Sequence, residues 1–342
     1  MMKKNIVPTD IKKILCIKPR GIGDIILSTI ILENLNSFFP NAQIHYLTEE
    51  FAKDAVSSHP LVIKVLTYKK NDSLISVVKK IRNEKYDIVF DLYSNPRTAQ
   101  ITFLSGAKYR IGYAYRGRKF AYNIKSEVGR GETHSAEHNL ELLNVSGIPI
   151  ISKRVNYQLT NESEEFAKSI LNKLITKEFL IGIIPSGGWN SKRCPKEKWV
   201  EIIKSLSEKV SCNVLILWGP EDFDDANFIR NNVNNSILAP ETDFKQMAGL
   251  LSKCNLVIAN DSGPMHLSAA LGIPTVGLFG PTDPKKHGPY SDKSDYVIKS
   301  DLHCIVCNKL ICPYNKECFY QMNIDEITSK AIKLLKSNAK EN

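Results

Sequence analysis

The sequence predicts an α/β protein built from two doubly wound, Rossmann-like domains. Three observations lead to this prediction: short apolar runs alternate with helical periodicity, the alternation is repeated in the second half, and several apolar runs end in a polar turn that opens a helix. Strands separated by helices form parallel βαβ units. A chain of 342 residues is long for one such domain and comfortable for two.

The first half of the chain alternates predicted strands with predicted helices. Pro40 ends the first helix because proline cannot continue it, and Gly147 and Pro149 end the last one. The predicted strands are 14–17, 43–47 and 87–92, and the predicted helices are 24–38, 74–82 and 138–145.

The second half repeats this alternation after the polar, acidic stretch 160–165. Its predicted strands are 180–184, 214–218, 256–259 and 275–279, and its predicted helices are 198–209, 225–233, 244–252 and 265–271. We therefore expect one domain over residues 1–160, a second over 161–323, and a tail helix within 324–342.

The composition is that of an ordinary globular protein, with 43% hydrophobic residues, 24% charged residues and a formal net charge of +10. The positive charge indicates an anionic partner, which is a nucleic acid, a lipid surface or a phosphorylated substrate. No helix-turn-helix, zinc-finger or RNA-recognition signature favours nucleic acid. There is neither a signal segment nor an apolar run near the roughly 18 residues of a membrane span. We expect a cytoplasmic protein, or one held on a membrane only by its surface.

The turn after the predicted strand 256–259 is the most informative segment. Asp261, Ser262 and Gly263 are helix-start residues, and Pro264 suits a first helical position because its missing N–H would be unpaired there. Backbone N–H groups and the positive end of a helix dipole then lie at a strand's carboxyl end, where open α/β sheets bind phosphates. A well-capped structural helix has the same pattern, so this shape alone leaves both interpretations open.

The loop after the first strand carries Gly21, Gly23 and Asp24. The third glycine of a dinucleotide fingerprint is replaced by Ile26, and a P-loop lysine is missing, which disfavours a nicotinamide dehydrogenase and a P-loop ATPase. Asp24 is either a helix cap, worth about 0.5–2 kcal/mol, or a carboxylate that takes a proton from an attacking hydroxyl.

Two further turns follow predicted strands in the second half. Ser186 opens a glycine-rich loop that leads to Lys192, and small residues followed by a cation suit a diphosphate. Glu221 follows the next strand, where a carboxylate can accept a hydrogen bond from a ribose or sugar hydroxyl. A lysine in solvent is the alternative for Lys192.

Four of the eight cysteines follow one another closely, as Cys304, Cys307, Cys312 and Cys318. In a cytoplasmic chain they indicate a metal site or free thiols rather than disulfides. The first spacing is typical of metal sites, whereas the other two differ from zinc ribbons. A structural zinc or iron therefore stays open. His134 and His138 lack a zincin glutamate, and we interpret them as an ordinary helix start.

Several segments resemble glycosyltransferase family 9, the ADP-heptose:lipopolysaccharide heptosyltransferases. Segment 260–284 resembles the donor-site signature nearly residue for residue, segment 23–29 (Gly-Asp-Ile-Ile-Leu-Ser-Thr) resembles the first loop, and 91–97 and 106–113 are similar to the acceptor domain. The resemblance covers about 14–322. It implies the GT-B architecture: an acceptor-binding first domain and a donor-binding second domain face each other across a cleft. It allows the tail helix to pack back onto the first domain.

The same resemblance implies an inverting glycosyltransferase whose chemistry needs no metal or other cofactor. A heptose would pass from ADP-heptose to a phosphorylated lipopolysaccharide core acceptor at the cytoplasmic face of the inner membrane. Asp24 would be the general base, and Lys192 would meet the charge that develops on the ADP. The expected donor-binding residues are Ser186, Glu221, Asp261, Ser262, Gly263 and His266, and the expected acceptor-binding residues are Arg20, Arg97 and Arg110.

The roles of Asp261 and of two arginines, and the function itself, have alternatives. Asp261 should repel a diphosphate, so we expect it to cap the helix, to hold hydroxyls or to hold a phosphate-binding neighbour. Arg97 and Arg110 could be surface arginines with no special role. Alternative functions are a family 9 enzyme with another nucleotide sugar or a protein acceptor, and a metal-containing nucleic-acid-binding regulator that uses the cysteines and the basic residues around Arg116.

Overall fold

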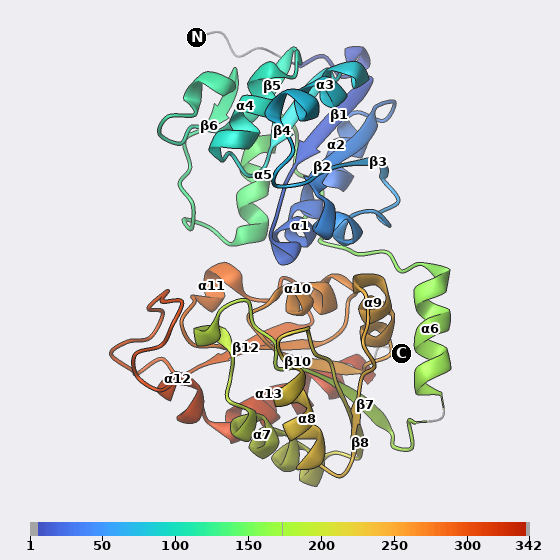
Figure 1. Ribbon diagram of the computed structural model, residues 1–342, viewed down its shortest axis with the longest axis vertical. Coiled ribbons are helices and arrows are strands. Elements are labelled where there is room, and N and C mark those ends of the chain that lie inside the picture. Colours follow the sequence, from blue (N-terminus) through green and yellow to red (C-terminus); the bar gives the residue numbers. More distant parts are fainter. Residues whose placement is uncertain (1–5, 173, 340–342) are drawn as a thin grey trace. The chain divides into compact units, whose positions relative to one another are not determined.

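The chain forms two compact units, residues 1–158 and 159–342. In the computed structural model the described residues are 6–172 and 174–339. Each unit contains one parallel six-stranded sheet with helices (Figure 1). The predicted α/β class with two doubly wound sheets is therefore confirmed. No helix in the described ranges is both long and apolar enough to cross a membrane.

The sheet of the first unit has the strand order β3-β2-β1-β4-β5-β6. The order reverses between β1 and β4, which pair in parallel, and open α/β sheets bind ligands outside the carboxyl ends of the strands at such a point. The strands are β1 (Lys13–Ile17), β2 (Gln43–Glu49), β3 (Val62–Tyr68), β4 (Ile88–Asp91), β5 (Tyr109–Tyr113) and β6 (Ile124–Ser126).

The predicted helix 24–38 is divided into three pieces. A 3₁₀ turn, Thr29–Ile31, separates two short helices because the Ser28 and Thr29 hydroxyls donate to the Ile25 and Ile26 carbonyls at 2.6 and 2.7 Å. Such bonds bend a helix. The helices of this unit are α1 (Ile22–Ser28), α2 (Leu32–Phe38), α3 (Leu74–Glu84), α4 (Pro96–Leu104) and α5 (Ser135–Val145).

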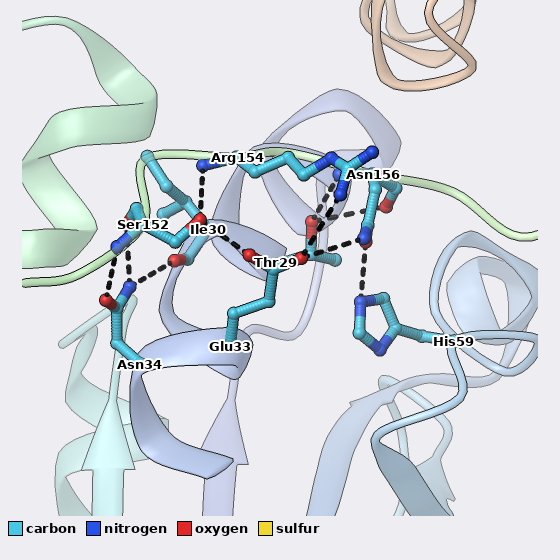
Figure 2. A network of polar contacts seen from close by, with 8 residues as sticks. All are labelled: Thr29, Ile30, Glu33, Asn34, His59, Ser152, Arg154 and Asn156. Carbon is cyan, nitrogen blue, oxygen red and sulfur yellow. Dashed lines mark hydrogen bonds and ion pairs between the residues drawn. The ribbon is translucent and has the colours of Figure 1, made fainter. Parts of the chain in front are cut away.

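Polar contacts hold the last segment of the first unit against α2 and the 3₁₀ turn (Figure 2). Asn34 Oδ1 accepts the N–H groups of Ile151 and Ser152 at 2.7 and 2.9 Å. Further along, the amide oxygen of Asn156 contacts His59 Nε2 at 2.6 Å. This segment has neither helix nor strand, so side chains satisfy its backbone groups.

The sheet of the second unit has the order β12-β11-β10-β7-β8-β9. Its order reverses between β7 and β10, which again pair in parallel. The strands are β7 (Phe179–Ile184), β8 (Cys212–Ile216), β9 (Ser236–Leu238), β10 (Leu256–Asn260), β11 (Thr275–Phe279) and β12 (Ser294–Ile298).

The second unit begins with a helix rather than with a linker. Thr160 and Ser163 form a capping box that starts α6, and α6 packs on α9 so closely that a Cβ on Gly249 would lie 2.0 Å from the Ser163 carbonyl oxygen. The helices are α6 (Asn161–Leu171), α7 (Lys196–Lys209), α8 (Phe223–Asn231), α9 (Phe244–Ser252), α10 (Gly263–Ala270), α11 (Pro284–His287), α12 (Glu317–Tyr320) and α13 (Ile324–Ala339).

The tail helix α13 belongs to the second unit (Figure 1). It packs on α7 and on strands β10, β11 and β12, and its residues Ile327, Ala331 and Leu335 are buried in the core of that unit. The family resemblance had allowed this helix to pack on the first domain instead. Its apolar stripe recurs at a four-residue spacing, and the face of the second sheet covers it.

Candidate active site

The predicted donor-binding residues gather at one edge of the second sheet. Strands β10, β7 and β8 are neighbours and run in parallel, so their carboxyl ends lie at the same edge. Ser186 follows β7, Glu221 follows β8, and Asp261 and Ser262 follow β10. Gly263 is the first residue of α10, and His266 is a buried residue in the same helix.

An ion pair joins two of these turns. The ammonium of Lys192 lies 2.7 Å from Asp261 Oδ2, with both side chains largely buried (16% and 7% exposed). The same carboxylate oxygen accepts a hydrogen bond from Thr282 Oγ1 at 2.6 Å, and the Lys192 ammonium lies 4.3 Å from the centre of the Trp189 ring. Of the three roles expected for Asp261, the structure gives it the contact with a cationic neighbour.

The N-terminus of α10 carries no side-chain cap. Ser262 is the N-cap residue, but its hydroxyl accepts no capping hydrogen bond. The Oγ atom of Ser262 is buried and finds no partner within the described ranges. A buried hydroxyl beside uncapped backbone N–H groups is an arrangement that an anion satisfies.

Arg193 was not singled out in the sequence, although it adjoins Lys192. Its guanidinium donates to the Gly187 carbonyl at 2.9 Å and pairs with Asp222 and Glu221 at 2.9 and 3.2 Å. It thereby ties the glycine-rich loop after β7 to the turn after β8. The adjacent pair of cations was the signal that could have identified it.

Asn260 is a second positioning residue that sequence reasoning missed. This fully buried side chain donates to the Pro185 carbonyl at 2.6 Å and accepts from the Cys194 N–H at 3.3 Å. Both ends of the loop that carries Lys192 are therefore bonded to the last residue of β10.

Residues 304–318, which we call the cysteine loop, contact the edge of the second sheet that carries the predicted donor-binding residues, which we call the donor edge. The N–H groups of Val306 and Asn308 donate to the carbonyls of Gly280 and Pro281 at 3.1 and 2.8 Å, and the Ser191 N–H donates to the Leu310 carbonyl at 3.2 Å. Both the lysine loop and the Gly280–Thr282 turn thus share one backbone support.

The four cysteines of this loop line one small pocket together with Ser191, Gly280 and Pro281. All eight cysteines of the chain are free. Burial raises the pKa of the Cys318 thiol to about 12, and the neighbouring cysteines add to the effect. Within residues 6–172 and 174–339, no group of three or more histidine, cysteine or acidic side chains is placed to hold a metal ion. The structural zinc or iron considered for these cysteines gains no support.

The predicted general base lies at the switch point of the first sheet. Asp24 is exposed in the first turn of α1, directly after β1, and makes no hydrogen bond or ion pair in the described part of the chain. Gly21 precedes the helix with φ +82°, and a Cβ there would come within 2.7 Å of Asp24 Oδ2. The positive φ favours glycine at this position, and the Asp24 carboxylate lies against it.

The three arginines predicted to bind the acceptor all have partners within the protein. Arg20 pairs with Glu49 at 3.2 Å. Arg97 donates to the Lys70 carbonyl at 3.1 Å, and Arg110 donates to the Ala121 carbonyl at 3.0 Å. These contacts connect neighbouring loops, and the acceptor-binding role of these residues stays a prediction.

Comparisons with known proteins place the chain in a family. The sequence model of glycosyltransferase family 9 (heptosyltransferase) matches residues 74–317. Lipopolysaccharide heptosyltransferase 2 of Escherichia coli (strain K12) is 25% identical over 308 residues, which cover 83% of this chain and 87% of that relative.

Two solved structures have a similar fold. A family 9 glycosyltransferase from Veillonella parvula matches with a TM-score of 0.84 at 23% identity and covers 98% of this chain and 100% of its own. The E. coli ADP-heptose lps heptosyltransferase II matches with a TM-score of 0.79 at 20% identity, with coverages of 96% and 99%. These likenesses confirm the GT-B fold class. Because the family model matches more than half of the sequence, the chain belongs to glycosyltransferase family 9 (heptosyltransferase) and is a glycosyltransferase.

Proposed function

We propose that this glycosyltransferase moves a heptose from ADP-heptose to a lipopolysaccharide core acceptor, with inversion at the anomeric carbon. The donor and acceptor classes come from the E. coli relative and the E. coli structure, whose names specify lipopolysaccharide and ADP-heptose. The formal net charge of +10 suits an anionic acceptor at a membrane surface.

The observation that carries the donor half of the proposal is the Lys192–Asp261 pair beside the uncapped start of α10. When the bond between the anomeric carbon and the ADP oxygen breaks, negative charge develops on the diphosphate. The Lys192 ammonium and the N–H groups of α10 stabilise that charge without having to reorganise, because the ion pair already holds the lysine. Our proposed chemistry relies on these groups and needs no metal ion.

Asp24 supplies the acceptor half of the reaction. Its carboxylate removes the proton from an acceptor hydroxyl while the hydroxyl oxygen forms the new bond to the anomeric carbon. The ADP leaves from the opposite face, so the configuration inverts. An exposed carboxylate in the first turn of α1, without a hydrogen-bond partner among the described residues, is suited to this transfer.

Calorimetric titration with ADP, UDP and GDP tests the donor half, in the presence and absence of a chelator. We expect ADP alone to bind well and the chelator to have no effect. Lys192→Ala should weaken ADP binding and slow transfer, whereas Lys204→Ala, an exposed lysine on α7, is the matched control. A preference for UDP or GDP would discard ADP-heptose and keep glycosyl transfer.

Incubation with ADP-heptose and lipopolysaccharide from a heptose-deficient strain tests the complete reaction. Mass spectrometry should show addition of one heptose, and NMR of the product should show the inverted anomeric configuration. Retention of configuration would contradict the single displacement assigned to Asp24.

A further inference from the structure

A buried lysine in the first unit, Lys18, forms no ion pair with any carboxylate of residues 6–172 and 174–339. Lys18 follows β1 and is 8% exposed, and its ammonium donates to the Leu92 carbonyl at 3.1 Å. An ammonium has three donors. A buried charge without an ion pair is costly, so this lysine is a candidate for pairing with a ligand.

Lys18 and a second cation, Arg130, both lie near the aromatic ring of Tyr93. Arg130, which follows β6, donates to the Tyr93 carbonyl at 2.6 Å, and its guanidinium lies 5.3 Å from the Tyr93 ring and 5.0 Å from the Tyr115 ring. The Lys18 ammonium lies 5.7 Å from the Tyr93 ring. Arg130 is exposed, and it too forms no ion pair with any carboxylate that the structure describes.

These two positive charges act on each other and on a nearby histidine. Burial lowers the pKa of Lys18, and the Arg130 charge lowers it further. His138 Nε2 contacts the Tyr115 hydroxyl at 3.0 Å, and burial together with the Lys18 and Arg130 charges lowers its pKa to about 4. His138 is therefore neutral near pH 7, and its pKa depends on the charges of both cations.

The acids near this cluster do not neutralise it by direct contact. Asp24 and, to a smaller extent, Asp91 favour the charged form of Lys18 without forming an ion pair with it. Asp91 is fully buried, and its carboxylate already accepts hydrogen bonds from the Tyr122 hydroxyl and the Ser94 N–H, each at 2.8 Å. Two cations held together without a paired anion favour binding of an external anion.

We propose that Lys18 and Arg130 bind an anionic group of the acceptor, a carboxylate or a phosphate, between the rings of Tyr93 and Tyr115. Lys18 follows β1 and Tyr93 follows β4, the two strands between which the order reverses, and Arg130 reaches this point from the segment after the edge strand β6 through its bond to the Tyr93 carbonyl. An anion held there places a neighbouring hydroxyl of the same acceptor near the Asp24 carboxylate. This inference rests on the proposed function for the role of Asp24, and the anion site itself does not depend on that role.

The contacts explain why these residues differ from the arginines singled out in the sequence. Arg97 and Arg110 use their N–H groups on backbone carbonyls of neighbouring loops. The Lys18 ammonium and the Arg130 guanidinium each donate to one backbone carbonyl and retain further donors. Arg97 and Arg110 are thus each held by two backbone carbonyls, whereas Lys18 and Arg130 are each held by one.

Direct binding to the full chain can be measured through the ring resonances of His138. Inorganic phosphate and glucuronate are the phosphate and carboxylate probes, added with saturating ADP so that the donor edge is filled. We expect saturable shifts with at least one probe, and the stronger probe identifies the anionic group. Arg130→Gln and Lys18→Met should weaken that binding about tenfold or more. Lys125→Gln, an exposed lysine of β6, should leave it unchanged.

Absence of saturable shifts with both probes would overturn the proposal, as would unchanged affinity in both variants. Thermal unfolding separates binding from a purely structural role of Lys18. Because Lys18→Met removes an unpaired buried charge, its midpoint should stay equal or rise. A lowered midpoint would mean that the bond to Leu92 is the main role of this lysine and would contradict the proposal.

Transfer kinetics distinguish failure of this inference from failure of the proposed function. With ADP-heptose and heptose-deficient lipopolysaccharide, Arg130→Gln should raise the KM for the acceptor about tenfold and leave the KM for ADP-heptose unchanged. An unchanged acceptor KM in an active enzyme would refute the anion site alone. Anion binding reported by the His138 resonances without any heptose transfer would refute the proposed function alone.

Discussion

The ammonium of Lys192 lies 2.7 Å from the carboxylate of Asp261, at an edge of the second sheet that we propose to bind a diphosphate. A carboxylate beside a diphosphate repels it, so an acid at this position needs a compensating role. Here the acid holds the lysine in place, and Thr282 in turn holds the acid. The lysine loop is thus joined to the turn after β10 before any ligand arrives.

Replacing Asp261 tests whether this acid strengthens or weakens ADP binding. We expect Asp261→Asn to weaken ADP binding about tenfold, because loss of the ion pair frees the Lys192 side chain. Calorimetry measures the affinity, and Asp292→Asn, an exposed acid of the same unit, is the control. Tighter ADP binding in Asp261→Asn would show that repulsion between the acid and the diphosphate is the larger effect.

Replacing Asp24 tests the general base. Asp24→Asn should lower turnover by about 10²–10⁴-fold and leave ADP affinity unchanged, because the donor edge belongs to the second unit. Steady-state kinetics measure the turnover and calorimetry measures the ADP affinity. Asp10→Asn, which replaces an exposed acid of the first unit, is the control. Turnover close to that of the unchanged enzyme would remove Asp24 from the mechanism.

Close packing of α6 on α9 predicts a stability defect at Gly249. Its Cβ would lie 2.0 Å from the Ser163 carbonyl oxygen, so Gly249→Ala must separate the two helices. We expect a loss of about 1–3 kcal/mol in the free energy of unfolding. Gly188→Ala, with nothing within 4 Å of its Cβ, should be nearly neutral in the same denaturant titration. Equal stability of the two variants would contradict the described packing.

The ionised Glu84 carboxylate should make a pH-dependent contribution to the free energy of unfolding of the first unit. Hydrogen bonds from the Lys64 and Lys13 ammonium groups lower its pKa from 4.5 to about 2. Since the folded-state pKa is depressed, this stabilisation is present above pH 4.5 and is lost as the pH falls toward 2. Urea unfolding between pH 6 and pH 2 should show that Glu84→Gln costs about 1 kcal/mol at pH 6 and little at pH 2. Glu50→Gln is the exposed control, and a pH-independent cost for Glu84→Gln would oppose this prediction.

The gathering of the predicted donor-binding residues at one sheet edge was predictable because these residues follow strands at fixed turns. Ser186, Glu221 and Asp261 each follow a buried apolar run, and neighbouring parallel strands bring such turns together. The Lys192–Asp261 contact itself was one of three alternatives, because sequence alone does not give the direction in which a side chain points.

The contacts of Lys18 and Arg130, on which our proposed anion site rests, were harder to predict for physical reasons. Arg130 follows β6, a three-residue strand with too few residues to show a periodicity, and its aromatic partners come from other strands. Lys18 stands in a loop after β1 where a buried lysine looks like any loop lysine. Arg97 and Arg110 were chosen from the family resemblance, which carries no information about their contacts with backbone carbonyls.

The packing of α6 has a practical consequence for separating the two units. Ala167 and Leu171 of α6 are buried, and the helix covers α9. A recombinant fragment that starts at β7 would leave this apolar face of α9 in water and would be prone to aggregation. A fragment that binds the nucleotide on its own should therefore start no later than Leu159 and continue through α13.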